Sequence, residues 1–218
     1  TPANIKNIFE HSFAAWQRHR TGRGTVPAAT LLWEDFLRHL SFLQAEGFVG
    51  DDDTLTGDGR WAARLRLDHP LLVAQCLREN VFPQDDEKLL AAAMAVFAYD
   101  REDELHVAAK DLPQNLNKLL GRLLVAIRPL QRRLENAGFP HVRLHRAAGA
   151  AVYHWANGRD WELVIKTSGI AEGDMATLVF RTADNLRQLA SLKDTHPQVA
   201  GSALRAAEAI LREPVLFL

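Results

Sequence analysis

The sequence contains a single cysteine, Cys76, and no apolar run near the ~20 residues that cross a membrane. One cysteine excludes an internal disulfide, and its place in an apolar helical pattern suits a reducing compartment, so we expect a cytoplasmic protein. No secretory signal pattern precedes the first helix. The chain opens at Thr1 inside an amphipathic pattern, which suggests a piece of a longer protein. A composition of 47% hydrophobic residues indicates a globular fold with a substantial core.

Motifs for catalysis are also missing. The chain has no G-x-x-x-x-G-K-[ST] loop, and therefore no local signature for binding a nucleotide phosphate. His141 and His145 have the i, i+4 spacing of a metal pair, but no neighbouring Cys, Asp or Glu completes a zinc site. No Ser-His-Asp or Cys-His set has a supporting motif. We expect no catalytic residue, metal or cofactor in this chain by itself.

Hydrophobic residues recur at steps of three and four along most of the chain. This period predicts an all-α protein, a multi-helix bundle. The longest predicted helix runs from Gln114 to Asn136, and a last helix begins at His196-Pro197. Pro129 removes one backbone donor from the long central helix, so we expect a kink there. The buried seam of that helix is formed by Leu116, Leu120, Leu123, Ile127, Leu130 and Leu134.

One short stretch predicts β-structure. Phe48-Val49, the acidic turn Gly50–Asp53 and Thr54-Leu55-Thr56 are typical of a small β-hairpin. With the helices on either side, from Phe36 to Leu65, this pattern also occurs in winged-helix DNA-binding proteins. The three aspartates of the turn lie where a wing would meet phosphates, which argues against that alternative.

Glycines and capping residues divide the segment 149–192 into three helices. Gly158 and Gly169 stand where helix C-termini favour positive φ, and Asp160 and Asp174 stand where a carboxylate can cap the next helix. The last of these helices has an apolar stripe and an opposite polar face, which could present side chains to a long partner. Four aromatic residues could stack on nucleic-acid bases, although core packing is favoured for Trp155: Tyr153, Trp155, Trp161 and Phe180.

Charge is distributed unevenly along the chain. The net charge is −1, yet between Leu112 and Arg159 the only acidic residue is Glu135. The cations of this basic block are Lys118, Arg122, Arg128, Arg132, Arg133, Arg143, Arg146 and Arg159. A block so poor in acids favours a polyanionic partner.

Several motifs stand in one order along the chain. They read Phe9-Glu-His-Ser-Phe-x-x-Trp-Gln17, Leu43-x-x-x-Gly-Phe48, Leu55-Thr-x-x-Gly-Arg60, Leu71-Leu-Val-Ala-x-Cys-Leu-x-x-Asn-Val-Phe82, Ala91-Ala-Ala-Met-x-x-Phe97 and Val215-Leu-Phe-Leu218. The segment 149–192 adds V-Y-x-W-x-x-G, E-G-D and L-V-F-R-T-A-D-N-L-R-Q-L. Together they resemble the DSHCT domain, the C-terminal helical domain of superkiller and exosome-cofactor helicases of superfamily two.

The resemblance implies a helical bundle beside two motor domains, forming one wall of the nucleic-acid channel. It implies a helix closing the helicase core over residues 1–20 and a DSHCT-like domain over 28–218, with halves at 28–100 and 113–218. The parent protein would be an ATP-dependent helicase that binds ATP and Mg²⁺, with single-stranded RNA or DNA and its own motor domains as partners. The helix beginning at Gly173-Asp174 matches the family segment that presents a basic side chain to the strand. Related sequences usually carry Arg at the position of Thr177 and Lys at the position of Asp58.

The candidate nucleic-acid-binding residues come from the resemblance and the basic block. They are Arg181, Thr177, Asp174, Lys118, Arg122, Arg132, Arg133 and Arg60. Two alternatives stay open beside a strand-guiding domain. One is a winged-helix DNA-binding regulator, and the other is a protein-interaction bundle whose basic face meets an acidic partner. No membrane partner is expected.

Overall fold

The computed structural model describes residues 5–8, 11, 28–100 and 112–217, and it divides into two compact units, residues 1–60 and 61–218. Of the helix predicted near the N-terminus, residues 5–8 are helical, His11 lies in a turn, and the rest is outside the described residues. The domain boundaries implied by the resemblance stay a prediction. No helix of the described residues is long and apolar enough to cross a membrane.

The described part of the first unit is built on helix α3 (Ala28–Ala45), which a turn connects to α4 (Gly57–Ala62). Gly47 ends α3 with a φ of 72°, a left-handed conformation that suits glycine. The Phe48 carbonyl lies so close to Gly59 that a Cβ there would be 1.9 Å from its oxygen. This contact fastens the start of α4 onto the turn.

The predicted β-hairpin is wrong. Among the described residues there is no strand, and this stretch forms only an isolated antiparallel bridge between Val49 and Leu55. The Asp52 carboxylate accepts from the Thr54 amide at 3.1 Å and from its hydroxyl at 2.8 Å, which closes a tight turn. The Thr56 hydroxyl then accepts from the Gly59 amide at 3.0 Å and starts α4. The pairing across the turn therefore stops at one bridge.

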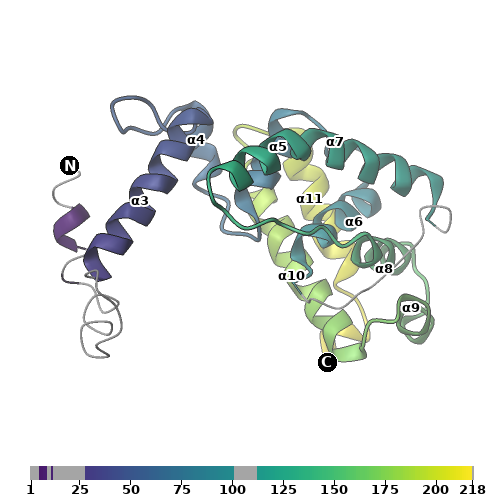
Figure 1. Cartoon of the computed structure of the whole chain (residues 1–218). Helices are drawn as coiled ribbons and strands as arrows, with labels where there is room; N and C mark the ends of the chain where they lie inside the picture. Colours follow the sequence, from purple (N-terminus) through teal and green to yellow (C-terminus); the bar gives the residue numbers. More distant parts are fainter. Residues whose placement is uncertain (1–4, 9–10, 12–27, 101–111, 218) are drawn as a thin grey trace. The chain divides into compact units, whose positions relative to one another are not determined.

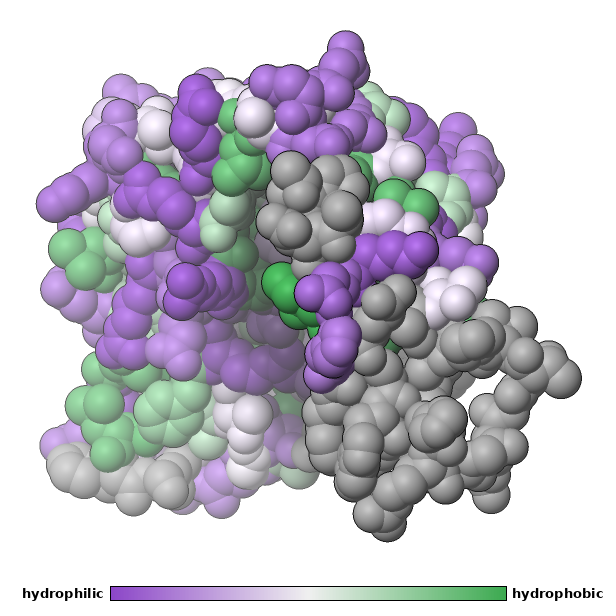
Figure 2. Space-filling view, turned by 90° about the vertical axis from the view of Figure 1, so that its left-hand side faces the viewer, coloured by the Kyte–Doolittle hydropathy of each residue, from purple (hydrophilic) through white to green (hydrophobic). Residues whose placement is uncertain are grey.

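The second unit is an all-helical bundle, as predicted (Figure 1). Its α-helices in chain order are α5 (Pro70–Arg78), α6 (Glu87–Ala98), α7 (Gln114–Asn136), α8 (Arg146–Ala156), α9 (Trp161–Ser168), α10 (Glu172–Ala190) and α11 (Pro197–Ile210). A 3₁₀ turn, η2 (Val215–Phe217), follows near the C-terminus. Figure 2 draws both units, and the side chains coloured in it are largely hydrophilic, with the hydrophobic ones in small separate groups.

Helix α6 is the centre of this bundle and packs against α7, α8, α10 and α11. Its start is capped by Asp86, whose carboxylate accepts from the Leu89 amide at 2.8 Å. Every residue from Leu90 to Ala98 is buried, and five of these are alanines. Such small side chains let neighbouring helices approach closely. On α8 such an approach occurs at Gly149, where a Cβ would lie 2.8 Å from the Val96 side chain and 3.0 Å from the Ala92 oxygen.

The longest helix, α7, has the bounds that the sequence predicts. Its seam residues are all buried, joined by Leu119, because their spacing of three and four keeps them on one side of the helix. The helix is continuous through Pro129, and the kink there stays a prediction. It packs on α5, α6 and α8 and leaves its other side exposed.

A tryptophan cluster fixes the start of α10. Trp155 is 1% exposed and donates to the Ile210 carbonyl at 2.8 Å, which confirms it as a core residue. Trp161 packs edge-on against Trp155 at 5.0 Å and donates to the Glu172 carboxylate at 2.9 Å. The Arg212 guanidinium lies 3.4 Å from the Trp155 ring centroid. The ends of α8 and α11 and the starts of α9 and α10 therefore meet in one place.

Candidate nucleic-acid interface

Helix α10 carries three of the predicted site residues: Asp174, Thr177 and Arg181. The helix forms because its apolar stripe is buried against α6 and α11. Its open side is centred on Thr177, Phe180 and Asp184, which follow one another at steps of three and four and are all exposed. The structure thus places one exposed, mainly polar face on a helix that is otherwise part of the core.

Asp174 does not cap this helix as predicted, whereas Asp160 caps α9 by accepting from the Leu163 amide at 3.1 Å. Helix α10 begins two residues before Asp174, at Glu172, and its N-cap is Ala171. The Trp161–Glu172 hydrogen bond draws the chain into the helix at that earlier point. Asp174 lies in the first turn, where the helix dipole favours a carboxylate.

Arg181 is held by two carboxylates. Its guanidinium contacts Asp68 at 2.7 Å and Asp100 at 2.5 Å, and 31% of its side chain is exposed. Asp68 also accepts from the Asn185 amide group at 3.1 Å. Partial burial lowers the pKa of Arg181, but the bonds to the two aspartates outweigh it and the net pKa is raised. Arg181 therefore ties α10 to the segment before α5 and to the end of α6.

The surface beside Arg181 is too shallow to enclose a base. A small depression is lined by Tyr99, Asp100, Asp174, Thr177 and Arg181, and its volume of about 20 Å³ is close to the space of one water molecule. The Thr177 hydroxyl donates to its own helix, to the Gly173 carbonyl at 2.8 Å. A nucleic-acid strand would have to lie across the outside of α10.

Phe180 is the one candidate stacking aromatic on this open face, with an exposed fraction of 41%. Trp155 and Trp161 are buried, and the Tyr153 hydroxyl accepts from Asn115 at 2.8 Å. The position of Phe180 follows from the helical period, because it lies away from Leu178 and Val179 around the axis. From the sequence, Phe180 is a possible stacking residue but not one of the predicted site residues, because it stands directly after the two core residues Leu178 and Val179.

The basic side chains of α7 lie opposite its leucine seam. Lys118, Arg122, Arg132 and Arg133 are all exposed, and so is Arg128. Among the described residues, Lys118, Arg122, Arg128 and Arg132 have no side-chain hydrogen bond or ion pair. The single acid of the basic block, Glu135, contacts His141. Four cations of this helix are therefore available to an external anion.

The structure does not bring all the predicted site residues together. Helix α7 packs on α5, α6 and α8, whereas α10 packs on α6 and α11, so α6 lies between the two faces (Figure 1). Arg60 is in the first unit, where it is exposed and donates to the Leu55 carbonyl at 2.8 Å. The candidate residues thus form an α10 set, an α7 set and Arg60 in a separate unit.

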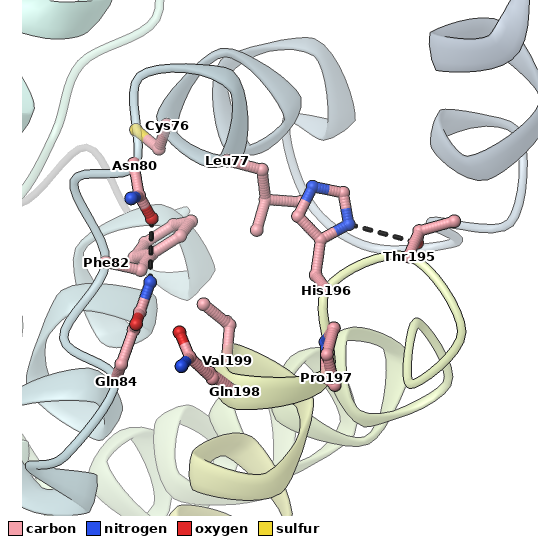
Figure 3. A pocket seen from close by; sticks show the side chains of 10 residues that line it. All are labelled: Cys76, Leu77, Asn80, Phe82, Gln84, Thr195, His196, Pro197, Gln198 and Val199. Carbon is pink, nitrogen blue, oxygen red and sulfur yellow. Dashed lines mark hydrogen bonds between the residues drawn. The ribbon is translucent and has the colours of Figure 1, made fainter.

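A larger hollow, of about 230 Å³, lies between the end of α5 and the start of α11 (Figure 3). Asn80 and Gln84 pair across one side at 2.8 Å, and His196 contacts Thr195 on the other at 3.0 Å. Cys76 lies on its wall, and burial raises the pKa of that thiol. No group of three His, Cys, Asp or Glu side chains in the described part of the chain is placed to hold a metal ion.

Similarity to known proteins agrees with this architecture. Residues 52–218 match the DSHCT (NUC185) domain. The chain is 24% identical over 168 residues to mRNA transport homolog 4 of Caenorhabditis elegans, an alignment that covers 74% of this chain and 16% of that protein. It is 38% identical over 61 residues to the DExH-box ATP-dependent RNA helicase DExH15, chloroplastic, of Arabidopsis thaliana, covering 28% of this chain and 5% of that protein. The chain thus spans a small part of the length of both relatives. Because the domain match covers most of its residues, this chain belongs to the DSHCT domain family.

Proposed function

We propose that this chain is the C-terminal, nucleic-acid-guiding domain of an ATP-dependent superfamily-two RNA or DNA helicase. In this proposal the domain lines the channel through which the unwound strand leaves. The motor domains of the same protein bind ATP and Mg²⁺ and supply the movement. The domain family and the similarity to a DExH-box helicase support this assignment.

The observation that carries the proposal is the open face of α10. This helix is the one that the resemblance places against the strand, and its other sides are buried against α6 and α11. Thr177 offers a hydroxyl on this face and Phe180 an exposed ring. A ring of this kind stacks on a base of any sequence, with a typical contribution of ~1–3 kcal/mol per base. Such contacts suit a strand that is passed along rather than read.

The charges near α10 favour contacts to bases over contacts to phosphates. Arg181 is neutralised by Asp68 and Asp100, and Arg187 is paired with Asp184 at 2.9 Å. Both arginines are thus already bonded to carboxylates, so a phosphate would have to compete for them, whereas an uncharged base would not. We therefore assign Arg181 a positioning role, since it holds the face on which Thr177 and Phe180 lie.

The experiment replaces Thr177 with Glu in the full-length protein. The added charge lies on the open face of α10 and should weaken strand contact, so strand unwinding should fall several-fold while ATP hydrolysis continues. Thr167→Glu is the matched control, because Thr167 is exposed on α9 and its hydroxyl likewise donates to the carbonyl four residues earlier, at 2.8 Å. Equal unwinding by the two variants would remove α10 from the strand path.

The alternative of a protein-interaction bundle predicts a different result. If the exposed cations served only an acidic protein partner, unwinding would not respond to charge on α10. The same pair of variants therefore separates the two functions.

A further inference from the structure

The outer face of α7 has the properties of a separate phosphate-binding surface. Lys118, Arg122, Arg128 and Arg132 project within an arc of about 120° and span about 21 Å along the helix, from its regular rise and rotation. None of the four makes a side-chain hydrogen bond or ion pair within the described residues. An exposed cation with no internal partner exchanges only water and counterions when it meets a phosphate.

This face lacks the groups that recognise single strands. Sites for unpaired nucleic acid combine cations with aromatic side chains on which bases stack. Helix α7 has no aromatic residue, and the centre of its basic face carries Val125, which is 74% exposed. Its chemistry fits a partner that presents phosphates outward and hides its bases. A duplex does both, and a DNA duplex carries one charge per ~1.7 Å of axis, or about a dozen along the length of this face.

The location of the face is also separate from the predicted strand path. Helix α6 lies between α7 and α10, and α7 has its contacts with α5, α6 and α8 (Figure 1). A strand following the open face of α10 therefore does not have to pass over the cations of α7. The two helices offer two chemically different surfaces. That of α7 is basic and has no aromatic residue, whereas that of α10 has an exposed Phe180 and arginines that are already paired.

We propose that the outer face of α7 binds the phosphate backbone of double-stranded nucleic acid, the part of a helicase substrate that has not yet been unwound. This inference rests on the proposed function and deepens it. The binding is independent of base sequence and sensitive to salt, because it consists of charge neutralisation. It would hold the duplex on the outside of the domain while the separated strand follows α10.

The experiment compares the full-length protein with a variant in which Lys118, Arg122, Arg128 and Arg132 are all changed to Ala. A matched control removes the same charge from exposed cations elsewhere in the second unit: Arg66, Lys166, Lys193 and Arg205, each changed to Ala. Binding of a blunt DNA duplex and of an oligouridine of equal length is measured without nucleotide over a series of salt concentrations. Thermal melts check that the exposed substitutions leave the fold intact.

The expected result concerns the slope of log affinity against log salt. For the duplex, the α7 variant should lose up to about 3.6 from the magnitude of the slope, which is four contacts at ~0.9 each. Its slope for oligouridine should change by less than the ~0.7 of one single-strand contact. The control variant should keep both slopes.

Three results would overturn the inference. An unchanged duplex slope would show that α7 does not touch the duplex, and the proposed function would still stand if Thr177→Glu lowers unwinding. If the magnitude of the salt slope of the α7 variant fell for oligouridine and not for the duplex, α7 would be assigned to binding the single strand. Unchanged slopes for both nucleic acids, with α7-dependent binding of polyglutamate, would assign the face to an acidic protein.

Discussion

The Arg181 guanidinium of α10 donates to the Asp68 carboxylate at 2.7 Å, although 113 residues separate the two in sequence. The other side of the guanidinium contacts Asp100 at the end of α6. Asp68 in turn accepts from Asn185, one turn further along α10. Arg181, a candidate for strand contact by resemblance, thus joins α10 to the segment before α5 and to the residues that follow α6. Its replacement should affect the stability of the fold before it affects any contact with a strand.

Arg181→Ala should lower the free energy of unfolding by about 1–2 kcal/mol, between the values for exposed and buried ion pairs. The change leaves Asp68 and Asp100 near each other without their shared cation. Arg181→Lys should lower the free energy of unfolding by a smaller amount. An ammonium keeps the charge, but it cannot bond both carboxylates as a planar guanidinium does. Chemical denaturation gives these values. A double-mutant cycle with Asp68→Asn measures the interaction energy between Arg181 and Asp68. If the two substitutions lowered the free energy of unfolding in a strictly additive way, the ion pair would not contribute to stability.

Gly149 should tolerate no side chain. A Cβ there meets Val96 at 2.8 Å and the Ala92 oxygen at 3.0 Å, so Gly149→Ala should separate α8 from α6 and destabilise the fold by about 1–3 kcal/mol. Gly121→Ala on α7 is the control, because nothing lies within 4 Å of its Cβ position. That control should stabilise the fold by about 0.5–1 kcal/mol through helix propensity. Thermal melts of both variants decide the point, and equal shifts would refute close packing at Gly149.

Local patterns predicted much of this fold because they depend on residues close in sequence. The seam of α7 fixes its bounds through the spacing of its leucines, and the carboxylate of Asp160 caps α9 as expected. Positive φ angles at Gly158 and Gly169 confirm both predicted helix ends. The β-hairpin was wrong because only Val49 and Leu55 pair across the Asp52 turn, and the Thr56 hydroxyl is already bonded to the start of α4.

The site could be predicted only in part, because long-range contacts decide it. The sequence places Arg181 on the polar side of α10, but not beside Asp68, which comes from a distant segment. The start of α10 depends on Trp161 reaching Glu172, so the cap expected at Asp174 did not form. The basic block is visible in composition alone. Helix α6 separates the cations of α7 from α10. This arrangement follows from the packing of the helices, which no local sequence pattern encodes.

The stability of the second unit should fall as the pH falls below the ordinary histidine pKa of 6.5. Partial burial lowers the pKa of His69, Asp68 opposes that shift and Arg181 adds to it, with a net decrease. The unfolded chain therefore binds a proton at a higher pH than the folded chain. The stability that neutral His69 contributes is present above this pH and is lost as the pH falls.

His69→Asn tests this effect. Asn tolerates the left-handed backbone at this position, where φ is 52°, and it does not titrate. The free energy of unfolding of the variant should depend less on pH below 6.5 than that of the parent. Burial also lowers the pKa of His154, so His154→Gln should remove a further part of the dependence. A slope unchanged in both variants would rule out these two histidines as its source.

Photo-crosslinking of a strand to the full-length protein tests the central claim most directly. A single strand carrying 4-thiouridine is bound without nucleotide, irradiated and mapped by mass spectrometry. The account predicts crosslinks on the open face of α10, at Thr177 and Phe180, and their loss in Thr177→Glu but not in Thr167→Glu. Crosslinks that reach the motor domains and leave α10 unmarked would contradict a strand-guiding role for this domain.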